Sequence, residues 1–176
     1  MEQQITFEEI VELANKGEIN AQFILANCYE QGVYTEKNSE QAFYWYLQCA
    51  MQGDAQAQHK VGLCYDIGNG VEQSYEKAFY WYKKSATQGF SKAQYNLASC
   101  YEEGQGAEQD LKRAFYWYKK AGEQGLLSAC LVLGYFYANG IGVERNVQEA
   151  IKWFTIPAEH GNEDAVKNLQ ILKNMG

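Results

Sequence analysis

The chain has 176 residues, of which 47% are hydrophobic, with a formal net charge of −7 and a single proline. This length can bury a real core without disulfides or metals, and the negative charge argues against general nucleic-acid binding, which needs clustered Lys and Arg. The N-terminus, MEQQITFEEI, lacks the apolar segment of a signal peptide and no apolar run approaches the roughly 18 residues of a membrane span, so we expect a cytoplasmic protein without membrane contact.

The sequence repeats itself with a period of 36 residues. Several registers recur at this step, and the tryptophans among them are Trp45, Trp81, Trp117 and Trp153. Because units of this length stack on their neighbours as structural repeats, we expect four repeats within a single domain covering 1–176. Their ranges are 18–53, 54–89, 90–125 and 126–161, with 6–17 as an N-terminal half-repeat and 162–176 as a C-terminal capping helix.

The first expected helix begins in TFEEIVELANKG, where Thr6 and Glu9 have the spacing of a capping box. The next segment, NAQFILANCYEQG, places its apolar residues on one helical face and stops at Gly32. Its counterparts stop at Gly68, Gly104 and Gly140. The second segment of each repeat then follows a good helix-capping residue, and these residues are Asn38, Ser74, Asp110 and Asn146. Each repeat is therefore predicted to be a helical hairpin.

The second segment carries four consecutive aromatic residues, as in AFYWYLQ from Ala42 to Gln48. The helical period puts Ala42, Trp45 and Tyr46 on one face, which we expect to be buried, whereas Tyr44 points away from it. The outward tyrosines are Tyr44, Tyr80 and Tyr116. Lys84 and Lys120 follow at a spacing that lets them lie over the last two rings. This outer row is either a set of partly shielded surface tyrosines or a second binding face.

Two positions depart from the pattern. Tyr34 stands where the later repeats have a glycine, at Gly70, Gly106 and Gly142, so we expect the first turn to differ. Pro157 lies near the end of the last second segment. Because proline removes a helical hydrogen bond, we expect that helix to end or bend early.

The pattern resembles the Sel-one-like repeat (SLR) family, a relative of the tetratricopeptide repeats, over nearly the whole chain. The resemblance rests on the Ala, Leu and Tyr of the first segment, on the GNG, GQG and GIG loops, and on the Ala, Trp and closing Gly of the second segment. We expect an all-α fold, a right-handed α/α superhelical solenoid of 36-residue helix-turn-helix repeats with a concave and a convex wall. The resemblance implies a protein-interaction module without catalysis or cofactor.

The residues that could carry chemistry have structural explanations. GNG and GQG lack the strand and the Lys-Ser/Thr of a phosphate-binding loop. Cys28, Cys64 and Cys100 share one register, where neighbouring helices stand too far apart for a disulfide. Secreted SLR proteins pair two cysteines within each unit, and that pairing is absent here, so we expect buried reduced thiols. No close ligand pair suggests zinc, and nothing singles out His59 or His160 for catalysis. We expect no catalytic, metal or cofactor site.

In related helical arrays the first helix of each unit lines the concave wall, so the resemblance implies a binding face there. The candidate residues are Phe23, Asn27, Glu30, His59, Leu63, Asp66, Tyr95, Ser99, Glu102, Leu131 and Tyr135. Their apolar side chains would anchor a partner, and their carboxylates would orient it. We expect a protein or peptide partner with basic and apolar side chains and no nucleic acid; the sequence leaves the oligomeric state open and favours a monomer.

Two functions fit such a face. The first is an adaptor that holds a partner in its groove. The alternative is a cytosolic inhibitor or immunity-type protein that neutralises a basic enzyme or toxin by tight binding. Residues 1–60 hold nine acidic and three basic residues, which would draw a basic partner to the N-terminal third. An inhibitor would abolish its target's activity, whereas an adaptor would leave its client active.

Overall fold

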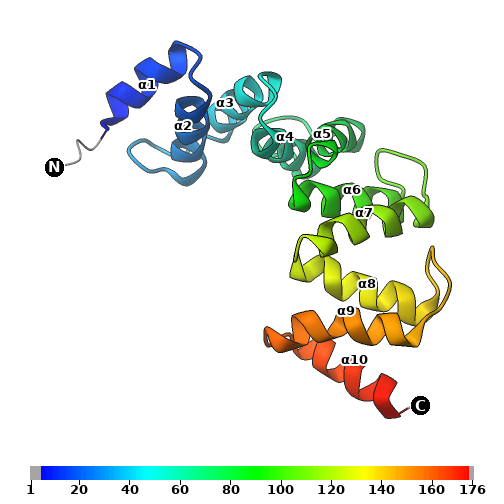
Figure 1. The fold of residues 1–176 in the computed structure, drawn as a ribbon. Helices are drawn as coiled ribbons and strands as arrows, with labels where there is room; N and C mark the ends of the chain where they lie inside the picture. The colour runs from blue at the N-terminus through cyan, green and yellow to red at the C-terminus, as the bar shows by residue number, and fades with distance from the viewer. Residues whose placement is uncertain (1–4, 175–176) are drawn as a thin grey trace. The chain divides into compact units, whose positions relative to one another are not determined.

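The computed structural model describes residues 5–174, and within them the chain forms ten α-helices and no strand (Figure 1). The first five are α1 (Phe7–Asn15), α2 (Ile19–Gln31), α3 (Ser39–Met51), α4 (Ala55–Ile67) and α5 (Tyr75–Thr87). The last five are α6 (Ser91–Glu103), α7 (Leu111–Glu123), α8 (Leu127–Asn139), α9 (Val147–Glu159) and α10 (Glu163–Asn174). The first helices of the four hairpins are α2, α4, α6 and α8, and the second helices are α3, α5, α7 and α9.

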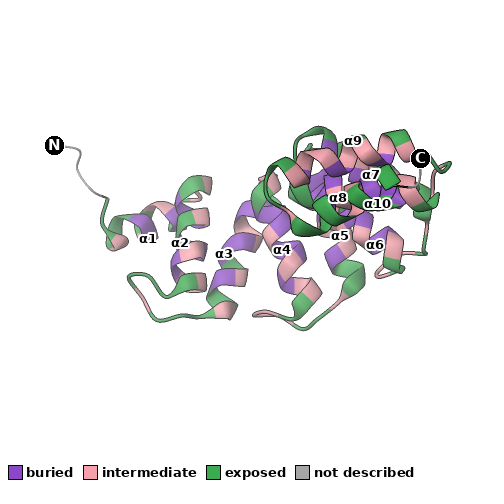
Figure 2. Cartoon of the chain, turned by 90° about the horizontal axis from the view of Figure 1, so that it is seen from below, coloured by how far each residue is buried: buried purple, intermediate pink, exposed green. Residues whose placement is uncertain are grey.

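The helices group into two units that divide between Gln88 and Gly89. The first unit holds α1 to α5, and the second holds α6 to α10. Within each unit every helix packs against the next one in the sequence. The buried residues lie on the helices and the loops are mostly exposed (Figure 2). The predicted all-α solenoid of helix-turn-helix repeats is therefore confirmed.

Caps fix where the helices begin and end. At α1 the Thr6 hydroxyl accepts from the Glu9 amide at 3.2 Å, and the Glu9 carboxylate accepts from the Thr6 amide at 2.8 Å, which confirms the predicted capping box. The residue before each second helix caps it, because its side chain accepts a hydrogen bond from a backbone amide of the first turn. These residues are Asn38, Ser74, Asp110 and Asn146. The first helices end at glycines in the left-handed conformation, Gly32, Gly68, Gly104 and Gly140. These caps confirm the predicted hairpins.

The second helices sort their aromatic residues by face, as predicted. The tyrosines that follow the tryptophans are at most 2% exposed, and they are Tyr46, Tyr82 and Tyr118. The outer row is about half exposed, at Tyr44, Tyr80 and Tyr116. Lys84 Nζ lies 5.0 Å from the centre of the Tyr80 ring, and Lys120 Nζ lies 5.8 Å from that of Tyr116. Trp45 is buried while the other three tryptophans are half-buried, so the tyrosines form the centre of the core.

The first turn keeps the backbone of the later ones, so the prediction that it would differ is wrong. Tyr34 adopts the left-handed conformation with a φ of 64°, where Gly70 has a φ of 74°. At Gly70 a Cβ atom would lie 2.1 Å from the carbonyl oxygen of Ser39, so only glycine fits there. The Tyr34 side chain is instead 75% exposed and stacks on Phe7, with ring centres 6.4 Å apart. The first turn therefore has room for a side chain that the second lacks.

Pro157 does not end its helix early, so that part of the second expectation is wrong. Helix α9 keeps the 13 residues of α3, α5 and α7. Pro157 lies in the last turn of the helix. A proline there removes one backbone hydrogen bond, and few helical hydrogen bonds lie beyond it to be disturbed. Its carbonyl still accepts from the amides of His160 at 3.1 Å and Asn162 at 3.0 Å, which close the helix.

All five cysteines are buried and have free thiols, at Cys28, Cys49, Cys64, Cys100 and Cys130. Among the helices of residues 5–174, none has the length and apolar character needed to span a bilayer.

Candidate functional site

The candidate residues occupy three registers of the first helices. In repeat order the first register holds Phe23, His59, Tyr95 and Leu131, the second holds Asn27, Leu63, Ser99 and Tyr135, and the third holds Glu30, Asp66 and Glu102. Six of these residues lie in the first unit and five in the second. Their joint lining of one groove stays a prediction. Within each unit they gather around the buried aromatic residue of the second helix in their own repeat, as the next contacts show.

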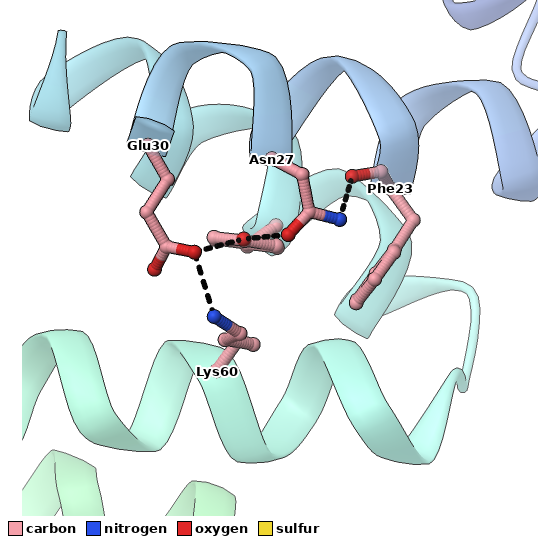
Figure 3. A network of polar contacts seen from close by, with 5 residues as sticks. Phe23, Asn27, Glu30 and Lys60 are labelled. Carbon is pink, nitrogen blue, oxygen red and sulfur yellow. Dashed lines mark hydrogen bonds and ion pairs between the residues drawn. The ribbon is translucent and has the colours of Figure 1, made fainter. Parts of the chain in front are cut away.

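In the first repeat the three registers meet around Tyr46, with Asn27 and Glu30 at its hydroxyl and Phe23 against its ring; Figure 3 shows Phe23, Asn27 and Glu30 side by side on α2. That hydroxyl lies 2.8 Å from Asn27 Oδ1 and 2.9 Å from Glu30 Oε2, so its one proton serves two acceptors. Asn27 in turn donates to the carbonyl of Phe23 at 2.9 Å, and the Phe23 ring meets the Tyr46 ring edge-on with centres 5.5 Å apart. Lys60, from α4, places its ammonium 2.7 Å from Glu30 Oε2.

Burial and the neighbouring carboxylate keep Tyr46 protonated. Burial, followed by the nearby Glu30 carboxylate, raises the pKa of Tyr46 far above its usual value. The phenol therefore remains a hydrogen-bond donor at any physiological pH. Lys60 also lies over the Tyr46 ring, 5.3 Å from its centre. Because both ends of the Lys60–Glu30 pair are partly exposed, it adds little stability by itself, but it joins the exposed faces of α2 and α4.

The same arrangement recurs in the next two repeats. Tyr82 donates to Asp66 at 3.0 Å, and Tyr118 donates to Glu102 at 2.7 Å. The register of Phe23 again lies against the tyrosine ring, with centres 5.9 Å apart for His59 and 5.3 Å apart for Tyr95. The carboxylates predicted to form an acidic edge are thus acceptors for the chain's own buried tyrosines.

The fourth repeat lacks this hydrogen bond because both of its ends are replaced. Phe154 stands at the register of the tyrosines, and Ala138 stands at the register of the carboxylates. The Tyr135 ring packs edge-on against Phe154 with centres 5.1 Å apart, and Leu131 belongs to the same apolar cluster.

The candidates differ in how much surface they offer. His59 is only 7% exposed, and its ring lies against Tyr82, so it offers a partner little. Tyr135 is 36% exposed. The other nine are half-buried.

An open hollow of about 350 Å³ lies on the first-helix face of the first unit. Its lining comes from α2, from α4 and from the residue before α4, and consists of Ile19, Asn20, Phe23, Ile24, Asp54 and Gln56. A second hollow of about 560 Å³ shares Ile19, Asn20 and Asp54 and adds Glu18 and Lys16, among others. Lys16 is paired with Glu12 at 2.7 Å, which leaves the carboxylates of Glu18 and Asp54 to set the local charge.

Sequence reasoning missed one register of this face. Ile24 is 44% exposed and lines the hollow, yet it was not among the candidates. Its counterparts at the 36-residue step are Lys60, Asn96, Val132 and Asn168. Lys60 reaches Glu30 of the preceding first helix, and Asn168 reaches the Tyr135 hydroxyl at 2.8 Å. The varied chemistry of this register, next to the first candidate register, was the signal in the sequence.

Thiols and imidazoles are the groups of the sequence that were considered for catalysis. Burial raises the pKa of Cys49 to about 12 and that of Cys64 to about 11, so neither thiol forms a thiolate near neutral pH. The His160 ring bonds through Nδ1 to the carbonyl of Ile156 at 2.9 Å. Within residues 5–174, no group of three or more His, Cys, Asp or Glu side chains is arranged to hold a metal ion.

Comparison with known proteins agrees with this architecture. The family model described as Sel1 repeat matches residues 19–54, 55–90, 91–126 and 127–162. No curated protein matches the chain.

Several solved structures resemble it, among them the following three. A protective antigen of uropathogenic Escherichia coli strains, which displays an SLR fold, is 34% identical with a TM-score of 0.89; the match covers 92% of this chain and 35% of the antigen. A Sel1 repeat protein from Oxalobacter formigenes is 33% identical with a TM-score of 0.84, over 92% of this chain and 68% of that one. Helicobacter pylori cysteine rich protein B is 25% identical with a TM-score of 0.59, over 74% and 94%. The chain thus spans about a third of the length of the E. coli antigen.

Proposed function

Because the chain belongs to the Sel1 repeat family, whose members are generally protein-interaction modules, we propose that it is a non-catalytic module that binds a protein or peptide on its first-helix face. The partner is a segment that combines apolar with basic side chains, and binding leaves it chemically unchanged. The module acts as an adaptor that holds this segment.

The observation that carries the proposal is the hollow beside Ile24. An exposed isoleucine next to the half-buried Phe23 offers an apolar anchor point, which is where binding energy concentrates in protein interfaces. The Asp54 carboxylate in its lining, the Glu18 carboxylate in the adjoining hollow, and the excess of acidic residues among 1–60 favour a basic neighbour on the partner. The varied residues of the first-helix registers supply the specificity.

A reducing compartment such as the cytosol is part of the proposal. Five buried thiols without a disulfide are typical of proteins kept in a reducing environment. A disulfide found by mass spectrometry in protein isolated from its own host would contradict this location.

The test is a selection of displayed random peptides on the intact chain, followed by calorimetry of the selected peptides. We expect sequences in which Lys or Arg neighbours an apolar residue. Ile24→Asp should weaken the best peptide by about tenfold or more, because it places a charge in the apolar anchor point. Met51→Asp is the matched control, since Met51 is 70% exposed at the end of the second helix α3 and should not affect binding.

Two results would contradict the proposal. One is a selection that yields no peptide with saturable binding. The other is a peptide whose affinity is equally reduced, or equally unchanged, in the Ile24 and Met51 variants. The inhibitor alternative is distinguished by what binding does to the partner. If a natural partner bound with sub-nanomolar affinity and lost its activity, the chain would be an inhibitor and not an adaptor.

A further inference from the structure

A third hollow, of about 400 Å³, lies in the second unit at the fourth repeat. It is lined by α8, the loop before α9, α9 and α10, through Tyr135, Ala138, Asn139, Arg145, Phe154, Asn168, Ile171 and Leu172. Phe154 and Leu172 are buried and form an apolar floor. Asp and Glu side chains are missing from this lining, whereas a guanidinium is present.

Three registers change together here. The carboxylate of the earlier repeats becomes Ala138, and the tyrosine that binds it becomes Phe154. At a further register, Lys37, Gln73 and Gln109 of the first three repeats are followed by Arg145. Compared with the second and third repeats, the fourth therefore loses an internal negative charge and gains a positive one at the same place.

In the last three repeats the side chain at this register donates a hydrogen bond to a backbone carbonyl of the first helix, and in the fourth repeat this bond holds the guanidinium in place. The side-chain amides of Gln73 and Gln109 donate to the carbonyls of Asp66 and Glu102 at 2.6 Å and 2.7 Å. Arg145 makes the same contact with its Nε, 3.0 Å from the Ala138 carbonyl. Its two Nη groups remain as donors, and no carboxylate of residues 5–174 forms an ion pair with them.

Tyr135 supplies a further donor. Its hydroxyl accepts from Asn168 Nδ2 at 2.8 Å, and the same Nδ2 also donates to the Asp164 carbonyl at 2.7 Å. Since the Tyr135 oxygen accepts that bond, its own proton is available, and no group within the described range 5–174 accepts it. Asn168 thus holds the hydroxyl in place beside the hollow.

We propose that this hollow binds a glutamate side chain of the protein partner, with the carboxylate on Arg145 and the Tyr135 hydroxyl. The partner's carboxylate would restore the negative charge that Glu30, Asp66 and Glu102 supply in the other repeats. A guanidinium offers paired donors that match a carboxylate. The apolar floor of Phe154 and Leu172 favours glutamate, whose two methylene groups can pack there. The inference rests on the proposed function in that the ligand belongs to a protein.

The test is an NMR titration of the intact, isotope-labelled chain with the blocked tripeptide acetyl-Leu-Glu-Leu-amide. We expect saturable shifts of the Arg145 Nε–H and Asn168 side-chain signals. The tripeptide with Gln in place of Glu should bind at least about tenfold more weakly, because the charge-assisted hydrogen bonds are lost.

Variants check the assignment. Arg145→Gln should weaken the Glu tripeptide about tenfold, and it should fold, because repeats two and three carry Gln at this register. Ala138→Glu should abolish binding by filling the hollow with the chain's own carboxylate, as in repeat three. Arg113→Gln, on a surface arginine paired with Asp110 at 3.2 Å, should leave binding unchanged.

Equal binding of the Glu and Gln tripeptides, or equal loss in the two arginine variants, would overturn the inference. Inorganic phosphate that binds as tightly as the tripeptide would overturn the assignment of a carboxylate. A negative result here would leave the proposed module function intact. That function is tested with other peptides and with variants of Ile24 and Met51, which lie in the first unit.

Discussion

The hydroxyl of Tyr118 donates a 2.7 Å hydrogen bond to the carboxylate of Glu102, from the second helix of a repeat to its first. Burial, with this carboxylate as the next cause, raises the pKa of Tyr118 far above its usual value, so the phenol stays a donor. Where the fourth repeat has Phe154 it also has Ala138, so donor and acceptor are lost together. The pair behaves as one unit of the repeat, present or absent as a whole.

The first prediction is that these two residues are strongly coupled. Tyr118→Phe leaves a half-buried carboxylate without its donor, and Glu102→Ala leaves a buried hydroxyl without its acceptor, so each should cost about 1 to 3 kcal/mol. The double variant copies the fourth repeat and should cost at least about 1 kcal/mol less than the sum of the two. Urea unfolding of the four proteins measures this coupling. Additive costs would mean that the pair is not a unit, and Tyr116→Phe in the exposed outer row is the neutral control.

The second prediction contrasts two neighbouring tyrosines. Tyr82 is fully buried, whereas Tyr80 is 50% exposed. Tyr82→Ala should therefore destabilise the chain by about 3 to 5 kcal/mol through the cavity it leaves, and Tyr80→Ala should cost under about 1 kcal/mol. Thermal or urea unfolding gives both values. A comparable loss in the two variants would contradict the assigned faces of α5.

The third prediction concerns two glycines with positive φ. A Cβ at Gly70 would lie 2.1 Å from the Ser39 carbonyl oxygen, whereas a Cβ at Gly53, with a φ of 99°, would meet no atom within 4 Å. Gly53→Ala should cost about 1 to 2 kcal/mol from backbone strain alone. Gly70→Ala should cost clearly more, since the start of α3 must also move. If the two variants unfolded at the same urea concentration, packing against Ser39 would not be what selects glycine at this turn.

The sequence was sufficient for features that depend on local pattern. Helix starts such as Asn38, helix ends such as Gly32, and the outward direction of Tyr44 follow from capping chemistry and the helical period, which act within a few residues. The two wrong expectations came from rules that hold on average. Tyr34 tolerates a left-handed backbone because its side chain is exposed, and Pro157 is tolerated because it falls in the last turn.

The candidate site was harder to predict because its contacts join helices. The varied registers around Phe23 and Glu30 were visible at the 36-residue step, but nothing local shows that Glu30 accepts from Tyr46 or pairs with Lys60. Those contacts depend on how α2 lies on α3 and α4. One signal was present in the sequence: Ala138 appears in the same repeat as Phe154, as expected for two positions that touch in the other repeats.

The last prediction concerns two buried thiols of the first unit, those of Cys49 and Cys64. Burial raises the pKa of Cys49 to about 12 and that of Cys64 to about 11, from a usual value of 9.0. As the pH rises above about 9, the unfolded chain loses these protons while the folded chain keeps them, so the unfolded state binds fewer protons. Stability should therefore be level below pH 9 and fall from pH 9 towards 12, by up to about 1.4 kcal/mol per pH unit for each group.

Urea midpoints measured from pH 7 to pH 11 check this dependence. The variant Cys49→Ala/Cys64→Ala should start lower, because it loses two buried side chains, but its midpoint should fall less steeply above pH 9. The comparison of slopes separates titration from packing, since a cavity lowers stability equally at every pH. Parallel curves for the two proteins would show that these thiols do not control the alkaline limit. The raised pKa of Tyr46 would then be the next candidate, because it too keeps its proton only in the folded chain.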